Sequence, residues 1–405
     1  MNSLPAQLLH ISCPVLPVPP SWFPGHMNRF TKQLPSMLSR THVVLEVRDA
    51  RLPLTSINRK LQDMLQEWRD KARMSNRMFQ HVILLNKADR VPEWGIPPFL
   101  SVMQDKYPEQ DFYFTSLKET SDLKRIYRIL SDLGKHYRWF EGMNVLIVGM
   151  PNVGKSSLLN ALRNTGIKGR TPKAVRTGAN PGVTVSLSNR IKIFENPLVY
   201  AFDSPGMMLP FLGHGPAGAE RGAKLALIAG IKEGLYQTET LAEYLLYKLN
   251  ILNSISPNYL SVLPSGSKPT ADVWEFLSLL AKRMGMLAGR GEYDLQRAAM
   301  FFIDWWRNKG GLAEHSDVGS YGWGFDFQWT VPAGEKRDLR QLMETSLAQF
   351  DAQVELEEQE GNMISDTQKE KTAVEERKKQ KLKKIMEQDK DQRSRRLFTK
   401  PRRRR

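Results

Sequence analysis

The 405-residue sequence predicts an α/β fold with a mostly parallel sheet, followed by a small all-α domain and a charged tail. Three observations indicate this. Apolar segments alternate with helical patterns before residue 150, apolar spacing becomes purely helical after residue 220, and positive charge collects near the C-terminus. We expect the α/β domain over 22–234, the helical domain over 235–345 and the tail over 346–405.

The α/β class depends on short apolar runs that have the length of buried strands. Helical patterns lie between them, at 56–74 and around 121–138. A β-rich segment from about 183 to 203 ends in "LVYAFDSPG". The four clearest predicted strands are "HVVLEVRDA" (42–50), "HVILLNKAD" (81–89), "DFYFTS" (111–116) and "MNVLIVGM" (143–150).

The helical region is predicted from apolar residues that recur at intervals of three and four, without strand-like alternation. These segments are "AKLALIAGIKEGL" (223–235), "LAEYLLYKLN" (241–250), "VWEFLSLLAKRMGML" (273–287) and "LQRAAMFFIDWWRN" (295–308). We expect Trp305 and Trp306 to pack in the core and at its edge rather than to stack on bases.

Composition restricts the partners and the compartment. The formal net charge of +16 favours polyanions, with nucleic acid first and an anionic membrane surface second. The single cysteine, Cys13, excludes an intrachain disulfide and a thiolate metal cluster, and it fits a reducing compartment. No apolar stretch reaches about 18 residues, so we expect no transmembrane span.

Both ends of the chain are unusual in charge. Residues 369–405 hold 17 Lys and Arg against 6 Asp and Glu, a net charge of +11. With almost no aromatic or β-branched residues, this tail is interpreted as disordered or partly helical, and RNA binding is favoured over a solvated helix without a partner. Residues 1–21 contain no charged side chain, which leaves a mitochondrial presequence and a plain disordered leader both open.

A phosphate-binding loop is predicted at 149–156, which reads Gly-Met-Pro-Asn-Val-Gly-Lys-Ser. It follows an apolar strand and precedes an amphipathic helix, the context that this motif requires. Inward-pointing backbone N–H groups of the loop and the following helix start would bind phosphate. Lys155 would reach the β- and γ-phosphates in a binding and catalytic role, and the Ser156 hydroxyl would bind Mg²⁺. The neighbouring nucleotide contacts are Val153, Gly154 and Ser157.

Two weaker motifs follow in the order and at the spacing expected after such a loop. In "NPGVT" (180–184), Thr184 is a candidate ligand of Mg²⁺ and the γ-phosphate. In "DSPG" (203–206), Asp203 would hold Mg²⁺ through water, and the Gly206 N–H would sense the γ-phosphate. Taken alone, the second motif could equally be a structural turn.

A guanine-reading motif is predicted earlier in the chain, at "NKAD". Asp89 can accept hydrogen bonds from N1 and N2 of guanine, which adenine cannot supply. Asn86 can contact the base and brace the phosphate loop, and the alkyl stem of Lys87 can cover the base. Ala88, between Lys87 and Asp89, is a further predicted nucleotide contact. In "FTSL" (114–117), the backbone of Thr115 and Ser116 would meet guanine O6.

The motifs of a GTPase are therefore present in rotated order, because base recognition precedes phosphate binding. The chain resembles the circularly permuted YlqF-type ribosome-assembly GTPases over about 22–310. The segments that carry this resemblance are "WFPGHM" (22–27), "DARLPLTS" (49–56), "NKAD", "GMPNVGKSSLLN", "NPGVT", "DSPG" and "RMGMLAGRGEYDLQRAA" (283–299). The leader and the basic tail suggest a eukaryotic mitochondrial member, although the long tail departs from compact bacterial members.

The resemblance implies a monomeric GTP hydrolase that uses GTP and Mg²⁺ in maturation of the mitochondrial large ribosomal subunit. Its partners would be ribosomal RNA and proteins, and its location the matrix or the matrix side of the inner membrane, with peripheral membrane association left open. A nucleolar or cytoplasmic location is the alternative. Two other functions stay open: a GTP-gated RNA scaffold with negligible turnover, and a membrane or signalling regulator.

GTP hydrolysis needs a side chain that orients the attacking water, and the position where many GTPases carry this side chain is occupied differently here. Many GTPases place Gln directly after Asp-x-x-Gly to orient water. Met207 stands there, so we predict hydrolysis that is slow without K⁺ and a ribosomal partner. Asn152 is one candidate helper, because an Asn at this position in related GTPases binds K⁺; the alternative is that it only stabilises the loop.

His26 is the second candidate, since an imidazole can position water or relay a proton. A histidine that fixes a turn or contacts RNA is the alternative interpretation. In the helical region, four basic residues have two interpretations: a face that binds ribosomal RNA, or an ordinary solvated helix face. Its residues are Lys282, Arg283, Arg290 and Arg297.

Overall fold

The computed structural model gives the arrangement of most of the chain between residues 13 and 359. It describes residues 13–19, 23–137, 141–167, 169, 172–175, 178, 189–209, 211–253, 255–308, 321–329 and 338–359. Residues 1–355 form one unit and residues 356–405 a second.

A six-stranded sheet is the frame of the α/β part. Its strands are β1 (Val43–Asp49), β2 (Gln80–Asn86), β3 (Asp111–Thr115), β4 (Met143–Gly149), β5 (Ile191–Phe194) and β6 (Val199–Asp203). Their order is β3-β2-β1-β4-β6-β5, and every neighbouring pair is parallel except β5 with β6. The predicted α/β class and its four clearest strands are therefore confirmed.

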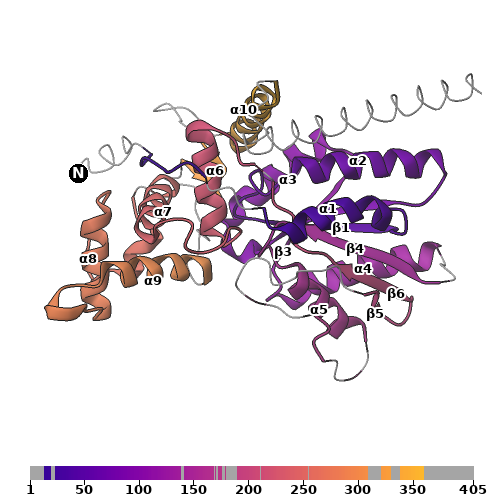
Figure 1. Ribbon diagram of the computed structural model, residues 1–405, viewed down its shortest axis with the longest axis horizontal. Helices are drawn as coiled ribbons and strands as arrows, with labels where there is room; N and C mark the ends of the chain where they lie inside the picture. The colour runs from indigo at the N-terminus through magenta and orange to yellow at the C-terminus, as the bar shows by residue number, and fades with distance from the viewer. Residues whose placement is uncertain are drawn as a thin grey trace, which may run out of the picture. The chain divides into compact units, whose positions relative to one another are not determined.

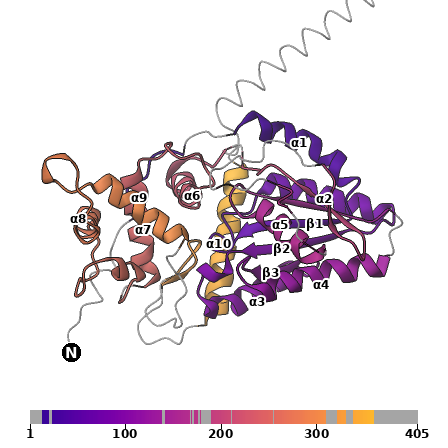
Figure 2. The same ribbon diagram turned by 90° about the horizontal axis from the view of Figure 1, so that it is seen from below.

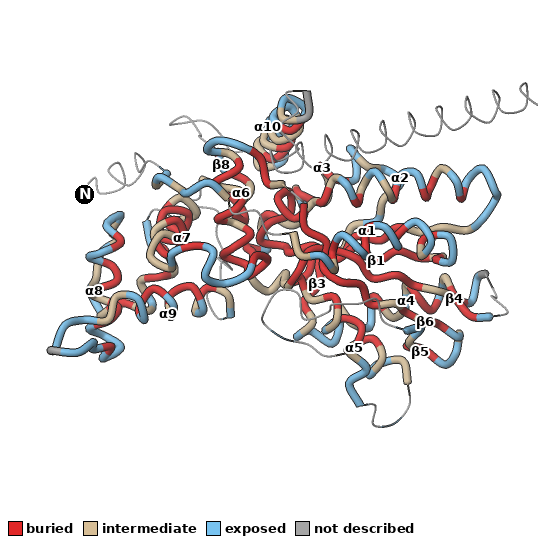
Figure 3. Tube along the Cα trace, viewed as in Figure 1, coloured by how far each residue is buried: buried red, intermediate tan, exposed pale blue. Residues whose placement is uncertain are grey.

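Helices cover both faces of this sheet. In chain order, the helices of the described residues are α1 (Gly25–Leu38), α2 (Arg59–Met74), α3 (Ile96–Lys106), α4 (Thr120–Tyr137), α5 (Lys155–Gly166), α6 (Gly215–Leu227), α7 (Thr238–Leu252), α8 (Val273–Met284), α9 (Leu295–Asn308) and α10 (Leu339–Gln359). The pairs α1–α2 and α4–α5 lie on opposite faces (Figure 1). Strands β1, β2 and β4 are buried almost throughout, as parallel strands between two helical layers must be (Figure 3).

Local sequence signals explain where several helices begin and end. The side chain of Asn58 caps α2 by accepting from the Leu61 amide at 3.2 Å. Asp272 caps α8 in the same way, and Gly285 ends it in the left-handed conformation. Helix α6 ends at Leu227, short of the predicted helical pattern that continues to 235, because Ala229 adopts a φ of +56°.

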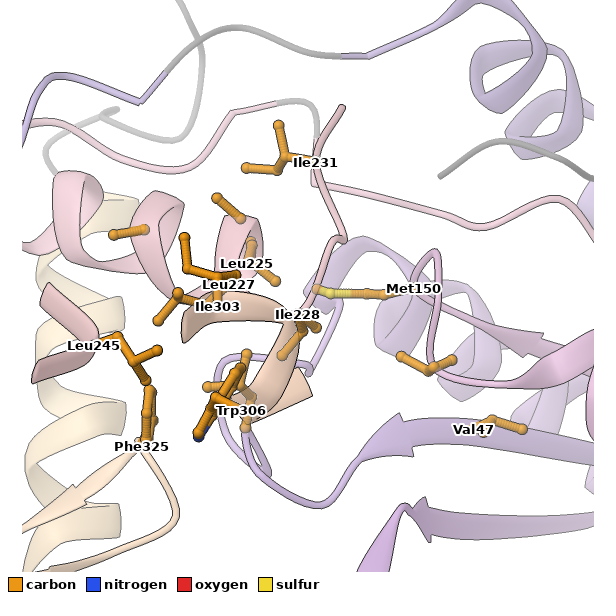
Figure 4. Close-up of a cluster of buried hydrophobic side chains, with 14 of the residues drawn as sticks. Val47, Met150, Leu225, Leu227, Ile228, Ile231, Leu245, Ile303, Trp306 and Phe325 are labelled. Atoms are coloured by element: carbon orange, nitrogen blue, oxygen red, sulfur yellow. The ribbon is translucent and has the colours of Figure 1, made fainter. Parts of the chain in front are cut away.

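The helical region packs around α7, α8 and α9, which lie side by side when the molecule is turned (Figure 2). Trp306 on α9 is fully buried, and Trp305 is partly buried against the same apolar cluster. Figure 4 shows Trp306 in this cluster with Ile228 and Ile303. The expectation of core and edge packing is confirmed, with Trp306 in the core and Trp305 at its edge.

The predicted all-α stretch 235–345 also contains strands, which corrects the sequence expectation. A hairpin pairs β7 (Gly322–Trp323) with β8 (Phe327–Gln328). Its aromatic residues pack against α3 and the β3 side of the sheet, where Trp323 contacts Phe99 and Phe114. Strands of two residues leave no alternating pattern, so the sequence did not reveal them.

Both predicted end segments lie largely outside the described residues. Helix α10 extends to Gln359, so the tail predicted from 346 begins as a helix; residues 360–405 are not described. Within the predicted leader 1–21, Leu16 packs against the main apolar cluster, whereas Val15 and Val18 are exposed. No helix in the described ranges is both long and apolar enough to cross a membrane.

The contact between the hairpin and α3 gives a stability prediction. Gly95→Ala should destabilise the fold by about 1–3 kcal/mol, because its Cβ would lie 2.2 Å from the buried Trp323 ring. That ring cannot easily move, since its Nε1 donates to the Pro92 carbonyl at 2.9 Å. Denaturant unfolding measures the effect. Gly25→Ala is the control, because nothing lies within 4 Å of its added Cβ; equal stability of the two variants would contradict the packing argument.

Candidate functional site

The sheet brings the predicted motifs to one edge. Asn86 at the end of β2 pairs in register with Asp49 on β1 and Thr115 on β3. Gly149, at the end of β4, pairs with Val47 on β1. Parallel strands present their carboxyl ends together, so the loops after β2, β3, β4 and β6 meet at this edge.

A cavity of about 690 Å³ lies where these loops meet. Ala88, Thr115, Val153 and Asp203 were also predicted as site residues, but they do not line it. Thr184 lies outside the described residues. The predicted residues that do line the cavity are Asn86, Lys87, Asp89, Ser116, Asn152, Gly154, Lys155, Ser156, Ser157 and Gly206.

Asn86 joins the base-reading loop (residues 86–90) to the phosphate loop (residues 149–156). Its Nδ2 donates to the Val153 carbonyl at 2.7 Å, which is the bracing role expected for it. Gly154 lies so close that an added Cβ would be 2.3 Å from this Nδ2, and its φ of +106° also requires glycine. Thus Val153 contributes through its carbonyl and Gly154 through its lack of a side chain.

Lys87 is held by both loops at once. Its Nζ donates to Asp49 Oδ2 and to the Asn152 carbonyl, each at 2.8 Å. Burial lowers the pKa of Lys87 to about 8, although Asp49 partly offsets this effect. Burial alone would raise the pKa of Asp49, but Arg51 and Lys87 hold it well below its usual range. The side chain of Lys87 is therefore fixed at its tip, while its stem lines the cavity.

Asp89 stands at the cavity with both carboxylate oxygens engaged. Ser116 Oγ donates to Oδ1 at 3.0 Å, and Lys118 Nζ donates to Oδ2 at 2.7 Å. Burial raises the pKa of Asp89, but hydrogen bonds from Lys118 and Ser116 outweigh it, so the pKa lies below its usual value. A carboxylate that is ionised at neutral pH can accept from donors on a ligand.

The phosphate-loop residues have the geometry of a cation and anion site. Ser156 Oγ donates to Asp203 Oδ2 at 2.6 Å, so two of the three predicted magnesium ligands are adjacent. Lys155 Nζ donates to the Met150 carbonyl at 2.7 Å. Burial lowers the pKa of Lys155 to about 8, and Asp203 partly offsets it.

The segment after β6 is fixed against the phosphate loop. An added Cβ on Gly206 would lie 2.7 Å from Pro151, so only glycine permits this approach. The Met207 amide donates to the Gly149 carbonyl at 3.1 Å, and its carbonyl accepts from Asn58 Nδ2 at 3.1 Å. The Met207 side chain is buried and does not line the cavity.

The two residues predicted to assist GTP hydrolysis, Asn152 and His26, lie in different places. Asn152 lines the cavity with a φ of +58°, and its Nδ2 donates to the Ala229 carbonyl at 2.6 Å. His26 lies in the first turn of α1 and does not line the cavity. Burial lowers the pKa of His26, and its buried Nε2 has no hydrogen-bond partner within the described ranges.

These residues fit a guanine nucleotide with Mg²⁺. Asn86 Oδ1 is buried without a hydrogen-bond partner in the described part of the chain, an arrangement typical of a position that a ligand completes. The Ser156 hydroxyl and the Asp203 carboxylate are the hard oxygen ligands that Mg²⁺ prefers. The ionised Asp89 can accept from the N1 and N2 donors of guanine.

Sequence reasoning missed several residues that complete the cavity. Lys118 follows the predicted "FTSL" loop directly, so its position was the available signal. Arg51 belongs to "DARLPLTS", a segment that indicates a family resemblance but has no pattern of its own that predicts a nucleotide contact. Arg90, Pro151 and Gly178 were missed as well, although the first two lie within or next to predicted motifs. A further group of missed residues comes from after α6 and from α9, which no local pattern connects to the nucleotide motifs: Ile228, Ala229, Glu233, Asp304, Arg307 and Asn308.

Taken together, the sheet, the phosphate loop and the base-reading loop define a P-loop GTPase. A family described as "50S ribosome-binding GTPase" matches residues 144–252. The chain belongs to the mitochondrial GTPase 1 family, also named mitochondrial ribosome-associated GTPase 1, because it covers most of the length of relatives that are about one third identical.

Two of these relatives illustrate the extent of the match. Mitochondrial ribosome-associated GTPase 1 of Xenopus tropicalis is 34% identical over 65% of this chain and 80% of its own length. Mitochondrial GTPase 1 of Schizosaccharomyces pombe is 34% identical over 72% of this chain and 87% of its own. The word "mitochondrial" in these names supports a mitochondrial location for this chain.

A plant relative and a solved structure are also similar. "Short integuments 2, mitochondrial" of Arabidopsis thaliana is 32% identical over 57% of this chain and 56% of its own length. A structure titled as GDP-bound TM YlqF is 20% identical, with a TM-score of 0.41, over 71% of this chain and 96% of its own.

The lowered pKa of Lys155 predicts pH-dependent nucleotide binding. Below pH 8 this lysine is charged and attracts phosphate; above it the lysine must regain a proton on binding, so affinity should fall by up to about tenfold per pH unit. Calorimetric titration of GDP between about pH 7 and pH 9 measures the slope. Lys155→Met should bind weakly at every pH with a flatter slope; an unchanged slope would assign the effect to another group.

Proposed function

We propose that this chain binds GTP, hydrolyses it to GDP and phosphate, and acts in assembly of the mitochondrial large ribosomal subunit. The observation that carries the nucleotide part is the cavity in which Asn86 joins the base-reading loop to the phosphate loop. The ribosomal part is supported by the names of the relatives and by the description of the matching family.

Each residue has a role that follows from its position. Asp89 accepts from the guanine edge, the stem of Lys87 covers the base, and the loop backbone at Ser116 faces O6, with Thr115 before it outside the cavity lining. Lys155 binds the β- and γ-phosphates, while Gly206 approaches the γ-phosphate through its amide. Ser156, Asp203 and the undescribed Thr184 are the proposed magnesium ligands, and the ion supplies positive charge against the phosphates.

We also infer that the GTPase domain is circularly permuted and spans 22–234. The supporting observation is that β2, with its base-reading loop, precedes β4, with its phosphate loop, although both belong to one parallel sheet. Circular permutation preserves a fold when the original termini lie close together. The segment proposed to sense the γ-phosphate, residues 203–206, then leads into α6 and the helical region.

The helical region over 235–345 and the tail over 346–405 are the proposed ribosome-binding parts. Lys282, Arg283 and Arg297 are exposed, as a basic RNA-binding face requires; the side chain of Arg290 is not described. Arg283 also donates to the Ser261 carbonyl at 2.7 Å, so part of its role is structural. We propose a monomer in the matrix or at the matrix side of the inner membrane.

A GTP-gated RNA scaffold with negligible turnover is the second candidate. The buried Met207 favours it, because a hydrophobic side chain anchored away from the cavity cannot orient the attacking water. In the scaffold, bound GTP would control RNA binding, and release would depend on nucleotide exchange.

Ribosomal stimulation separates these functions. Purified mitochondrial large subunits should raise GTP hydrolysis by at least about tenfold, because a partner must supply what Met207 cannot. Multiple-turnover phosphate release measures the rate, and small subunits are the control. The same large subunits should co-purify from mitochondria with the chain locked by a non-hydrolysable GTP analogue. Binding without stimulation would favour the scaffold, and capture of membranes instead would favour a signalling regulator.

Potassium should act through Asn152. We expect faster hydrolysis in K⁺ than in Na⁺ at equal ionic strength, because a bound K⁺ would balance charge that develops on the phosphates. Asn152→Ala should remove the difference between the two salts while retaining GDP binding. Equal wild-type rates in the two salts would contradict this role and leave Asn152 a structural one, to which its contact with Ala229 belongs.

A further inference from the structure

We propose that the C-terminal turn of α9 positions the guanine-reading loop, so that the helical region controls guanine affinity and specificity. The loop is defined here as Asn86–Arg90. Trp306 and Arg307 of α9 connect to Lys87, two residues before Asp89, and to Arg90, the residue after it. This inference rests on the proposed nucleotide function, and it adds a route by which another part of the chain regulates that site.

The first connection runs from Trp306 to Arg51. The guanidinium of Arg51 lies 4.5 Å from the centre of the Trp306 ring, and both side chains are fully buried. Arg51 Nη1 has no hydrogen-bond partner among the described residues, and a guanidinium over an aromatic face is attracted by the ring. Phe325 stacks on Trp306 with ring centroids 4.9 Å apart, and its amide donates to the Arg51 carbonyl at 2.8 Å. Figure 4 labels both aromatic residues in the same buried cluster.

Arg51 continues this connection to Lys87. Its Nε and Nη2 donate to the Asp49 carboxylate at 2.9 and 2.8 Å. Lys87 Nζ donates to the same carboxylate at 2.8 Å. A fully buried carboxylate is costly unless its partners remain in place, so a displacement of Arg51 must be matched by Asp49 and Lys87. The same Lys87 amine also holds the phosphate loop through the Asn152 carbonyl.

The second connection runs from Arg307 to Arg90. Arg90 Nη1 donates to the Arg307 carbonyl, and Arg90 Nε lies 3.8 Å from Asp89 Oδ2. The Arg307 side chain in turn donates to the Leu227 and Ala226 carbonyls at the end of α6, at 2.7 and 3.0 Å. One turn of α9 therefore holds the residue after Asp89 and also the end of the helix that follows the γ-phosphate segment.

These two connections make the position of Asp89 depend on α9. Asp89 discriminates by accepting from the 2-amino group of guanine, which hypoxanthine lacks, and small displacements of a carboxylate weaken such a contact sharply. A partner that moves α9 would change guanine affinity, and bound nucleotide would change the affinity for that partner by the same factor.

The test compares GDP with IDP, whose base lacks the 2-amino group. Trp306→Leu keeps an apolar side chain but removes the aromatic face above Arg51. In the full chain it should weaken GDP binding by about tenfold, within the range of about 5–150-fold that is typical of such coupling. IDP binding should weaken less, so the dissociation constant of IDP divided by that of GDP should fall. General loosening of the fold would weaken both nucleotides equally and leave the ratio unchanged.

A matched control lies next to it. Trp305→Leu makes the same chemical change on α9, but Trp305 stacks on Phe302, with ring centroids 5.9 Å apart, and should keep the wild-type ratio. If Trp306→Leu does not fold, Arg51→Lys tests the same connection, because lysine keeps the charge and loses the paired contact to Asp49. A folded Trp306 or Arg51 variant with the wild-type ratio would overturn the inference. If the wild-type chain bound neither nucleotide, the proposed function itself would fail.

Discussion

The hydrogen bond from Asn86 Nδ2 to the Val153 carbonyl is the contact on which the site depends. Strands β2 and β4 are not neighbours, because β1 lies between them, so the base-reading and phosphate loops meet only above the end of β1. Asp49 ends β1 there and accepts from Lys87, which in turn reaches the phosphate loop. Two bridges thus fix the distance between the part that selects the base and the part that binds phosphate.

Buried charge is tolerated at this junction because every group has a partner of opposite sign or an aromatic face. Asp49 is fully buried yet accepts from Arg51 and Lys87, and Arg51 lies against Trp306. Removing Asp49 would leave the buried Arg51 and Lys87 without the carboxylate that both contact, which costs more than the pairs contribute. The junction therefore specifies one arrangement of the loops, and a specific arrangement is what discrimination between similar bases needs.

Sequence reasoning predicted the parts of the site that follow strands. Asn86, Asp89, Lys155 and Asp203 could be placed because each motif comes directly after an apolar run, and parallel strands end at one edge. The wall formed by α9 could not be predicted, since Arg90 and Arg307 are joined only by tertiary packing. The hairpin was missed because its strands are two residues long. His26 does not line the cavity, and its position depends on how α1 packs. The motif "WFPGHM" alone does not predict that packing.

The proposed rotation of the motifs shortens the path from phosphate to the helical region. In this chain α6 begins nine residues after Gly206, and its end is held by Arg307, while Ala229 contacts Asn152 of the phosphate loop. A change near the γ-phosphate thus reaches α9 through one helix, and α9 meets the guanine-reading loop from the other side. Had base recognition come last in the chain, the helical region would follow that part of the fold instead. The proposed rotated order places it beside the segment that we propose senses the γ-phosphate.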